Sequence, residues 1–99
     1  MARRTFQIQR ITVNGRPISR VVVDDHATEN HPDITDDTIL DLVRLLDGIE
    51  QSPDDKKQPF EYFATLLPLQ EKQYRLVWLL EDEQLYVGVL TAYRDDRSQ

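Results

Sequence analysis

The chain contains no cysteine, which excludes disulfides and thiolate metal sites and makes its stability independent of an oxidising compartment. Long hydrophobic runs are also missing, so no stretch approaches the length needed to span a membrane. Residues 1–4 lead into alternating polar residues, and we therefore expect no signal peptide. These absences predict a cytoplasmic protein that does not contact a membrane.

Acidic residues are missing from the first 20 positions, which carry five arginines: Arg3, Arg4, Arg10, Arg16 and Arg20. All 18 acidic residues follow later in the chain, so the net charge of −6 hides a basic N-terminal segment. A polyanion such as RNA would be drawn to this segment and repelled by much of the remaining surface. The alternative is that these arginines pair with carboxylates elsewhere in the same molecule.

The residues that are present are typical of a globular protein. Of the 99 residues, 39% are hydrophobic and 30% are charged, which predicts one domain over residues 1–99. Asn14-Gly15 is the preferred pair for a tight hairpin turn, so residues 5–13 and 16–24 should pair as antiparallel strands. The apolar residues before this turn change phase around Arg10, which predicts a bulge in the first strand.

A helix is predicted over residues 36–47. Thr35 is suited to be its N-cap, and Ile34 and Ile39 occupy the positions of a hydrophobic staple. Gly48 is placed to end the helix in a left-handed conformation. The helix should bury one apolar stripe, formed by Ile39, Leu42, Val43 and Leu46.

After the helix, residues 50–59 are polar and are predicted to form an exposed loop, and three strands should follow over residues 60–67, 73–80 and 85–93. The middle strand should be central in its sheet. In the last strand, one face should be formed by Leu85, Val87, Val89, Thr91 and Tyr93. The predicted class is α+β: an N-terminal β-hairpin and one main helix packed on a mostly antiparallel sheet, in the order ββ-α-βββ. Strand packing explains Tyr62, Tyr74, Trp78 and Tyr86.

Two histidines, His26 and His31, flank a short polar stretch between the second strand and the helix. Because imidazole titrates near neutrality, the pair could accept a proton from a ribose 2′-hydroxyl and return one to a leaving group. Two alternatives remain open. The histidines could be ordinary surface residues. They could also form a metal site with the nearby acidic residues Asp24, Asp25, Glu29 and Asp33. The spacing of these residues, however, matches neither a zinc-protease pair nor a calcium loop.

Thr91 and Tyr93 lie two positions apart on the last predicted strand, so their side chains should project from one face. Arg94 should point to the other face unless the strand has already ended. A hydroxyl, a phenol and a guanidinium at a sheet edge can hold a phosphate and stabilise the charge that develops on it. The alternative is that Thr91 and Tyr93 simply complete a hydrophobic stripe.

The strand that leads to His26, the segment His31-Pro32-Asp33-Ile34-Thr35 that opens a helix, and the final Thr91-Ala92-Tyr93-Arg94 resemble the barnase, EndoU, colicin and RelE-like group of small toxin ribonucleases. The similarity spans roughly residues 18–95. It implies a RelE-like fold and RNA cleavage without a metal or cofactor. His26 and His31 would be the acid–base pair, and Thr91 and Tyr93 would orient the phosphate or substrate.

In this hypothesis the candidate substrate-binding residues are Arg94 and two arginines of the hairpin, Arg16 and Arg20. A toxin of this kind would need a neutralising protein partner, a cognate antitoxin. The alternative function is a non-catalytic protein-interaction module, such as a degenerate relative, an antitoxin or an immunity-type protein. The enzyme hypothesis requires one of the two histidines to lie close to Thr91 or Tyr93, whereas the interaction module has no such requirement.

Overall fold

The computed structural model describes residues 3–28 and 33–95. The elements of this part are β1 (Arg3–Val13), β2 (Arg16–Asp24), the short 3₁₀-helix η1 (Asp25–Thr28), α1 (Asp36–Arg44), β3 (Asp55–Lys57), β4 (Phe60–Leu69), β5 (Lys72–Glu81) and β6 (Val87–Arg94). The predicted α+β class is confirmed, with one α-helix and one six-stranded sheet in the described ranges. None of the helices there is long and apolar enough to cross a membrane.

The sheet has the strand order β1-β2-β6-β5-β4-β3. Its neighbouring strands are antiparallel except for β2 and β6, which run parallel through the pairs Val21 with Val87, Val22 with Gly88 and Val23 with Val89. This pairing joins the N-terminal hairpin to the three-stranded meander of β4, β5 and β6. The second strand and the last strand therefore end at the same side of the sheet.

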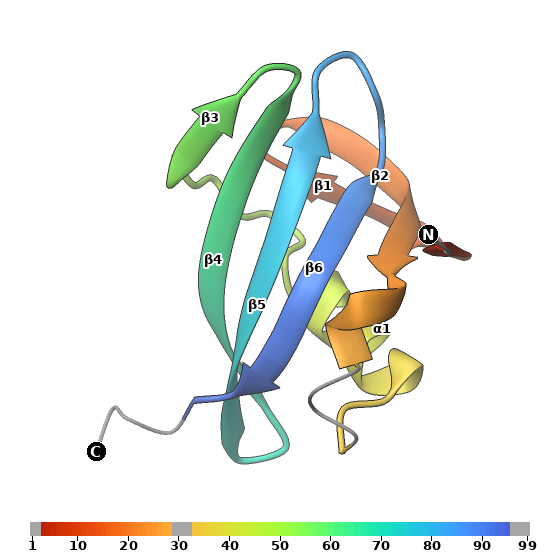
Figure 1. The fold of residues 1–99 in the computed structure, drawn as a ribbon, viewed down its shortest axis with the longest axis vertical. Helices are drawn as coiled ribbons and strands as arrows, with labels where there is room; N and C mark the ends of the chain where they lie inside the picture. The colour runs from red at the N-terminus through yellow and green to blue at the C-terminus, as the bar shows by residue number, and fades with distance from the viewer. Residues whose placement is uncertain (1–2, 29–32, 96–99) are drawn as a thin grey trace.

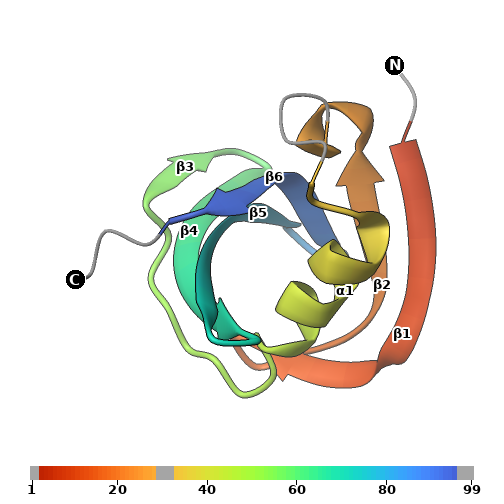
Figure 2. The same cartoon turned by 90° about the horizontal axis from the view of Figure 1, so that it is seen from below.

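The sheet curls around α1, with β1 and β2 on one side of the helix and β4, β5 and β6 on the other (Figure 2). Alternate residues of β1, β2, β4, β5 and β6 point inward, and they form one core with the apolar stripe of α1. At its centre the rings of Phe63 and Trp78 stack with their centroids 4.1 Å apart. The predicted central position of the strand that carries Trp78 is confirmed, because β5 lies between β4 and β6.

The predicted hairpin and helix start are confirmed. Asn14 and Gly15 adopt φ angles of 50° and 79°, as a tight turn between antiparallel strands requires, and the register of β1 against β2 shifts between Gln7 and Ile11. At the helix, the Thr35 side chain accepts a hydrogen bond from the backbone N–H of Thr38. These features depend on neighbours in sequence, and local sequence is sufficient to specify them.

The helix ends at Arg44 rather than at residue 47. Beyond Arg44 the chain tightens into turns and is tied to β1, where the backbone N–H of Gly48 donates to the carbonyl of Thr12 at 2.6 Å. The Asp47 carboxylate also accepts from the backbone N–H of Thr12 at 2.9 Å. These bonds to a distant strand compete with further helical turns and shorten α1. Gly48 still adopts the predicted left-handed conformation, with φ 85°.

Two expectations about the strands are corrected. The predicted loop over residues 50–59 contains β3, which pairs with the start of β4, so the order is ββ-α-ββββ and not ββ-α-βββ. In β6, Trp78 pairs with Val89 but Val77 pairs with Thr91, so Leu90 is an extra residue at a bulge. The bulge moves Thr91 to the face opposite Val89, and Leu85 lies before the strand and is exposed.

Candidate functional site

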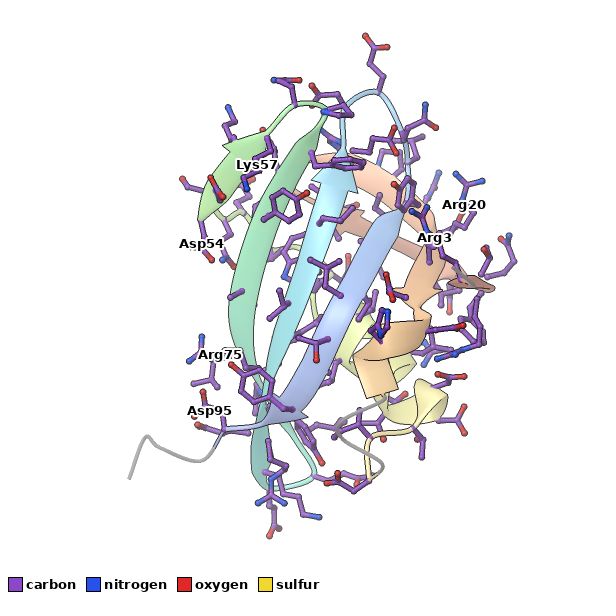
Figure 3. The ribbon with its side chains drawn as sticks, viewed as in Figure 1. Arg3, Arg20, Asp54, Lys57, Arg75 and Asp95 are labelled. Carbon is purple, nitrogen blue, oxygen red and sulfur yellow. The ribbon has the colours of Figure 1, made fainter. Side chains whose placement is uncertain are left out.

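The face of the sheet turned away from α1, here called the outer face, is not covered by any described helix or strand (Figures 1 and 3). It contains a hollow of about 230 Å³ over β4, β5, β6 and β2. Its lining combines aromatic and aliphatic side chains with three charged residues, Arg3, Asp24 and Glu81. We call it the aromatic hollow; the residues that matter for its chemistry are Arg3, Val22, Asp24, Phe60, Tyr62, Leu79, Glu81, Tyr86 and Gly88.

Strand register assembles the aromatic hollow. Tyr62 pairs with Leu79, Leu79 with Gly88, and Gly88 with Val22, so these four residues form a row across four adjacent strands. Because Gly88 has no side chain, the surface of the sheet is recessed at this position of the row. A Cβ atom at that position would lie 2.7 Å from Cδ1 of Leu79, which means that the Leu79 side chain occupies the space beside the glycine. The hollow therefore depends on a glycine in the interior of a strand.

Tyr86 forms one wall of the aromatic hollow through a fixed hydrogen bond. Its hydroxyl donates to Oε1 of Glu81 at 2.6 Å, and the guanidinium carbon of Arg20 lies 5.6 Å from its ring centroid. Burial, followed by the hydrogen bond and the negative charge of Glu81, raises the pKa of Tyr86 to about 12. The phenol is therefore protonated at neutral pH and keeps its ring in place.

Three cations of this region form no salt bridge with any described residue: Arg3, Arg20 and Lys57. Figure 3 places Arg3 and Arg20 together on one side of the outer face and Lys57 on the other, at β3. Arg4 behaves differently, because it pairs with Asp25 at 2.8 Å and with Asp36 at 2.9 Å. Internal pairing with carboxylates thus explains Arg4 but not Arg3 or Arg20.

Of the proposed catalytic residues, His26 lies in an element that contacts the strand of Thr91 and Tyr93. Because β2 runs parallel to β6, the chain leaving β2 enters η1 beside β6, and the two elements are in contact. His26 lies in η1 and is exposed, while its backbone N–H donates to Oδ1 of Asp24 at 2.8 Å. His31 lies outside the described residues.

On β6, Thr91 and Tyr93 point to the outer face, because Ala92 between them is fully buried in the core. Neither of them lines the aromatic hollow, and His26 does not line it either. Asp24 does line it, and Asp24 is also bonded to the backbone of His26. The hollow and the histidine segment are therefore adjacent through one shared residue.

The predicted substrate-binding arginines lie in different places. Arg94 stands at the end of β6, with its guanidinium carbon 6.0 Å from the ring centroid of Tyr74. Arg20 lies near Tyr86, toward the start of β6, and Arg16 donates to the carbonyl of Glu81 at 2.9 Å. Arg16 thus holds the β5–β6 connection against β2. The structure does not gather these three arginines around one point.

Sequence reasoning missed several residues of this face. The alternation of side chains along a strand could have identified Phe60 and Tyr62. Both lie an odd number of positions from the buried Phe63, so their side chains face away from the core. Arg75 and Asp95 were also missed. They form an ion pair of 2.8 Å beside Tyr93, which is the register partner of Arg75, and the Asp95 side chain is only 4% exposed.

Comparisons with protein-family models, curated proteins and solved structures found no match. Within residues 3–28 and 33–95, no three His, Cys, Asp or Glu side chains are grouped so that they could hold a metal ion. Function is therefore inferred from the geometry and charge of this chain.

Proposed function

We propose that the protein is a RelE-like ribonuclease of the toxin type, which binds RNA across the outer face of the sheet and cleaves it by general acid–base chemistry without a metal. The observation that carries this proposal is the contact between η1 and β6, which brings the segment of His26 to the strand that presents Thr91 and Tyr93 outward. The exposed imidazole of η1 and the hydroxyl and phenol of β6 are the kinds of group that phosphodiester cleavage needs.

In the proposed reaction the ribose 2′-oxygen attacks the adjacent phosphorus while His26 accepts its proton. The bond to the 5′-oxygen breaks, and this leaving group takes a proton from a second acid, for which His31 is the candidate. The products are a 2′,3′-cyclic phosphate and a free 5′-hydroxyl. Thr91 and Tyr93 donate hydrogen bonds to the phosphate oxygens. Arg94 takes no part in this step, because it lies on the opposite face, over the ring of Tyr74.

The charge of the outer face supports RNA as the substrate. The whole protein carries a net charge of −6, yet Arg3, Arg20 and Lys57 stand around the aromatic hollow without a salt bridge to any residue in the described part. Phosphate groups would neutralise these cations, and exposed aromatic rings stack with bases of a single strand. A cytoplasmic location with a neutralising partner protein belongs to the same proposal.

The test is cleavage of a short end-labelled RNA by the purified full chain in the presence of a metal chelator. His26→Ala and Tyr93→Ala should each lower the cleavage rate by about 10²- to 10⁴-fold, the range that a positioned acid or base contributes. Thr91→Ala should also lower the rate, and Thr5→Ala is its matched control, because Thr5 is an exposed threonine of β1. RNA that stays intact at high concentrations of wild-type protein would end this proposal.

A second candidate is a protein-interaction module without catalytic activity. It is favoured by the apolar surface that continues beyond the aromatic hollow, where Leu66 of β4 is 39% exposed on the same face. A partner covering this face would bury Leu66 together with Phe60 and Tyr62. Stable binding of a partner protein by a chain that leaves RNA intact would establish this alternative, and Leu66→Asp should then weaken that complex.

A further inference from the structure

We infer that the aromatic hollow is a subsite for a single nucleobase of the bound strand, with the phosphate next to that base lying toward Arg3 and Arg20. This inference rests on the proposed function only in taking RNA as the ligand. Occupation of the hollow requires no cleavage. The two proposals can therefore fail separately.

The form of the hollow suits a flat apolar group. Tyr62, Leu79 and Val22 lie in one row across the sheet, and Gly88 adds no side chain to that row. Phe60 precedes Tyr62 and Tyr86 precedes Gly88, each by two positions, and both rings line the hollow beside this row. The rings of Phe60 and Tyr62 are inclined at 51° with centroids 6.2 Å apart. A volume of about 230 Å³ bounded by such rings accommodates one heterocycle and not a folded protein segment.

Two carboxylates in the lining of the hollow suit the edge of a base. Glu81 and Asp24 both line the hollow and present carboxylate oxygens, which accept hydrogen bonds from the amino and imino groups of nucleobases. Glu81 is held in place by the hydroxyl of Tyr86, and Asp24 by the backbone of His26. A purely aliphatic ligand would displace water from these carboxylate oxygens without donating a hydrogen bond in return, which costs free energy.

The unpaired cations indicate that the ligand is also anionic. Arg3 lines the hollow and Arg20 lies over the ring of Tyr86, and neither has a salt bridge among the described residues. A nucleotide combines an aromatic heterocycle with a phosphate, and so it satisfies the apolar walls, the carboxylates and the cations together.

The hollow also has a defined relation to the proposed cleavage residues. Asp24 lines the hollow with its side chain while its Oδ1 accepts the backbone N–H of His26 at 2.8 Å. A strand whose base occupies the hollow would therefore pass next to the segment of His26. This connection gives the hollow a role in positioning the strand.

The first measurement is a titration of the wild-type full chain with each of the four nucleoside 5′-monophosphates, followed by two-dimensional NMR of the backbone amides. Ribose 5-phosphate and inorganic phosphate are the controls, because they carry the charge without the base. We expect saturable shifts at Tyr62, Leu79 and Gly88 with at least one nucleotide, and no such shifts with the two controls. Equal shifts with ribose 5-phosphate would reduce the site to a phosphate contact and overturn the inference.

Variants locate the binding. Tyr62→Ala should weaken nucleotide binding by about 10- to 100-fold, the effect of losing one stacking partner, while Tyr62→Phe should retain it. Tyr62→Leu keeps apolar volume and removes the ring, so it provides a folded test if the alanine variant fails to fold. Leu66→Ala, on the same strand and face outside the hollow, is its control.

Arg3→Ala should also weaken binding, whereas Arg10→Ala, at an exposed position of the same strand outside the hollow, should not. His26→Ala should lower the cleavage rate by about 10²- to 10⁴-fold and leave mononucleotide binding unchanged, because His26 does not line the hollow. Nucleotide binding without any cleavage by the wild type would end the ribonuclease proposal and retain the base subsite. The opposite result is a wild type that cleaves RNA, binds no nucleotide and loses no cleavage rate on Tyr62→Leu. It would overturn the base-subsite inference and leave the ribonuclease proposal standing.

Discussion

At the scale of single residues, Gly88 decides the shape of the outer face. A Cβ atom there would lie 2.7 Å from Cδ1 and 3.0 Å from Cγ of Leu79, and 3.4 Å from Cε1 of Tyr86. The first two distances are shorter than packed carbon atoms tolerate. The Leu79 side chain would have to move outward, into the space of the aromatic hollow. The space beside Leu79, and not an unusual backbone angle, is thus what favours glycine at position 88.

We predict that Gly88→Ala lowers the free energy of unfolding by about 1 kcal/mol. The added methyl group reduces the backbone freedom of the unfolded chain, which stabilises by roughly 0.5–1 kcal/mol, but overpacking against Leu79 costs about 1–3 kcal/mol. Urea unfolding monitored by Trp78 fluorescence measures the difference. The double variant Gly88→Ala, Leu79→Ala should recover part of the loss caused by the clash. Equal stability of Gly88→Ala and the wild type would show that Leu79 gives way freely.

Tyr86 gives a prediction about pH. Its pKa is raised to about 12 by burial and by Glu81, whereas a tyrosine in the unfolded chain titrates near 10. The folded state therefore binds this proton more tightly, so the stabilisation is complete below pH 10 and is lost as the pH rises toward 12. Tyr86→Phe has no such proton. The difference in unfolding free energy between the wild type and Tyr86→Phe should shrink over that interval.

The ultraviolet absorbance of the phenolate provides the control. Glu81→Gln removes the charge and weakens the acceptor, so Tyr86 should then lose its proton at a lower pH than in the wild type. An unchanged titration in Glu81→Gln would mean that burial alone raises the pKa.

At the scale of elements, α1 starts at a side-chain cap that sequence identifies without ambiguity. Thr35 adopts an extended conformation, and its hydroxyl accepts the backbone N–H of Thr38 at 3.2 Å. Asp36 and Asp37 in the first turn complement the positive end of the helix dipole. Asp36 also forms a salt bridge with Arg4 of β1, which connects the start of the helix to the edge strand.

Thr35→Ala should therefore lower the free energy of unfolding by about 1 kcal/mol, the usual effect of removing an N-cap oxygen. Thr35→Ser keeps the oxygen and should lie within a few tenths of a kcal/mol of the wild type. Thermal and urea unfolding of the two variants compare them directly. Should both variants lose the same stability, the threonine methyl group rather than the cap would be responsible.

The last strand illustrates how an element can be located correctly and its face assigned wrongly. Alternation from Val87 predicts that Thr91 and Tyr93 share the core face of Val89, but the bulge at Leu90 reverses the phase. The bulge depends on the hydrogen-bond register between β6 and β5, and the sequence of β6 alone does not predict it. The reversal has a functional consequence, because it turns a hydroxyl and a phenol outward.

At the scale of the whole molecule, the outer face carries arginines that no described carboxylate neutralises through a salt bridge. Arg3 and Arg20 form no salt bridge within the described ranges, although the protein has 18 acidic residues and 12 basic ones. Binding of a polyanion at the outer face should consequently depend strongly on salt, because each phosphate contact releases counterions.

We predict that the logarithm of the affinity for a short single-stranded RNA falls linearly with the logarithm of the salt concentration. Removing both Arg3 and Arg20 by alanine substitution should reduce the slope by about 0.7 per charge. Arg44→Ala is the control, because Arg44 lies on α1 in a pair with Asp41. Fluorescence anisotropy over a salt series gives the slopes. Equal slopes for the double variant and Arg44→Ala would place the RNA elsewhere on the molecule.

The candidate site could be predicted only in part. Sequence identified Thr91 and Tyr93 as neighbours on one strand, and it placed His26 directly after β2. It did not identify the aromatic hollow, because the row from Tyr62 to Val22 is contributed by four strands whose order in the sheet is not encoded in any one of them. Arg3 was assigned to a basic segment without a location for the same reason.

By itself the sequence determined the hairpin at Asn14-Gly15, the start of α1 and the inward side chains of β5, since turns, caps and alternation arise from residues close together in the chain. Only the tertiary structure decided that β2 pairs with β6, that β6 carries a bulge and that α1 stops at Arg44. Each of these is settled by hydrogen bonds between segments far apart in sequence, whose partners are chosen when the sheet closes around the helix.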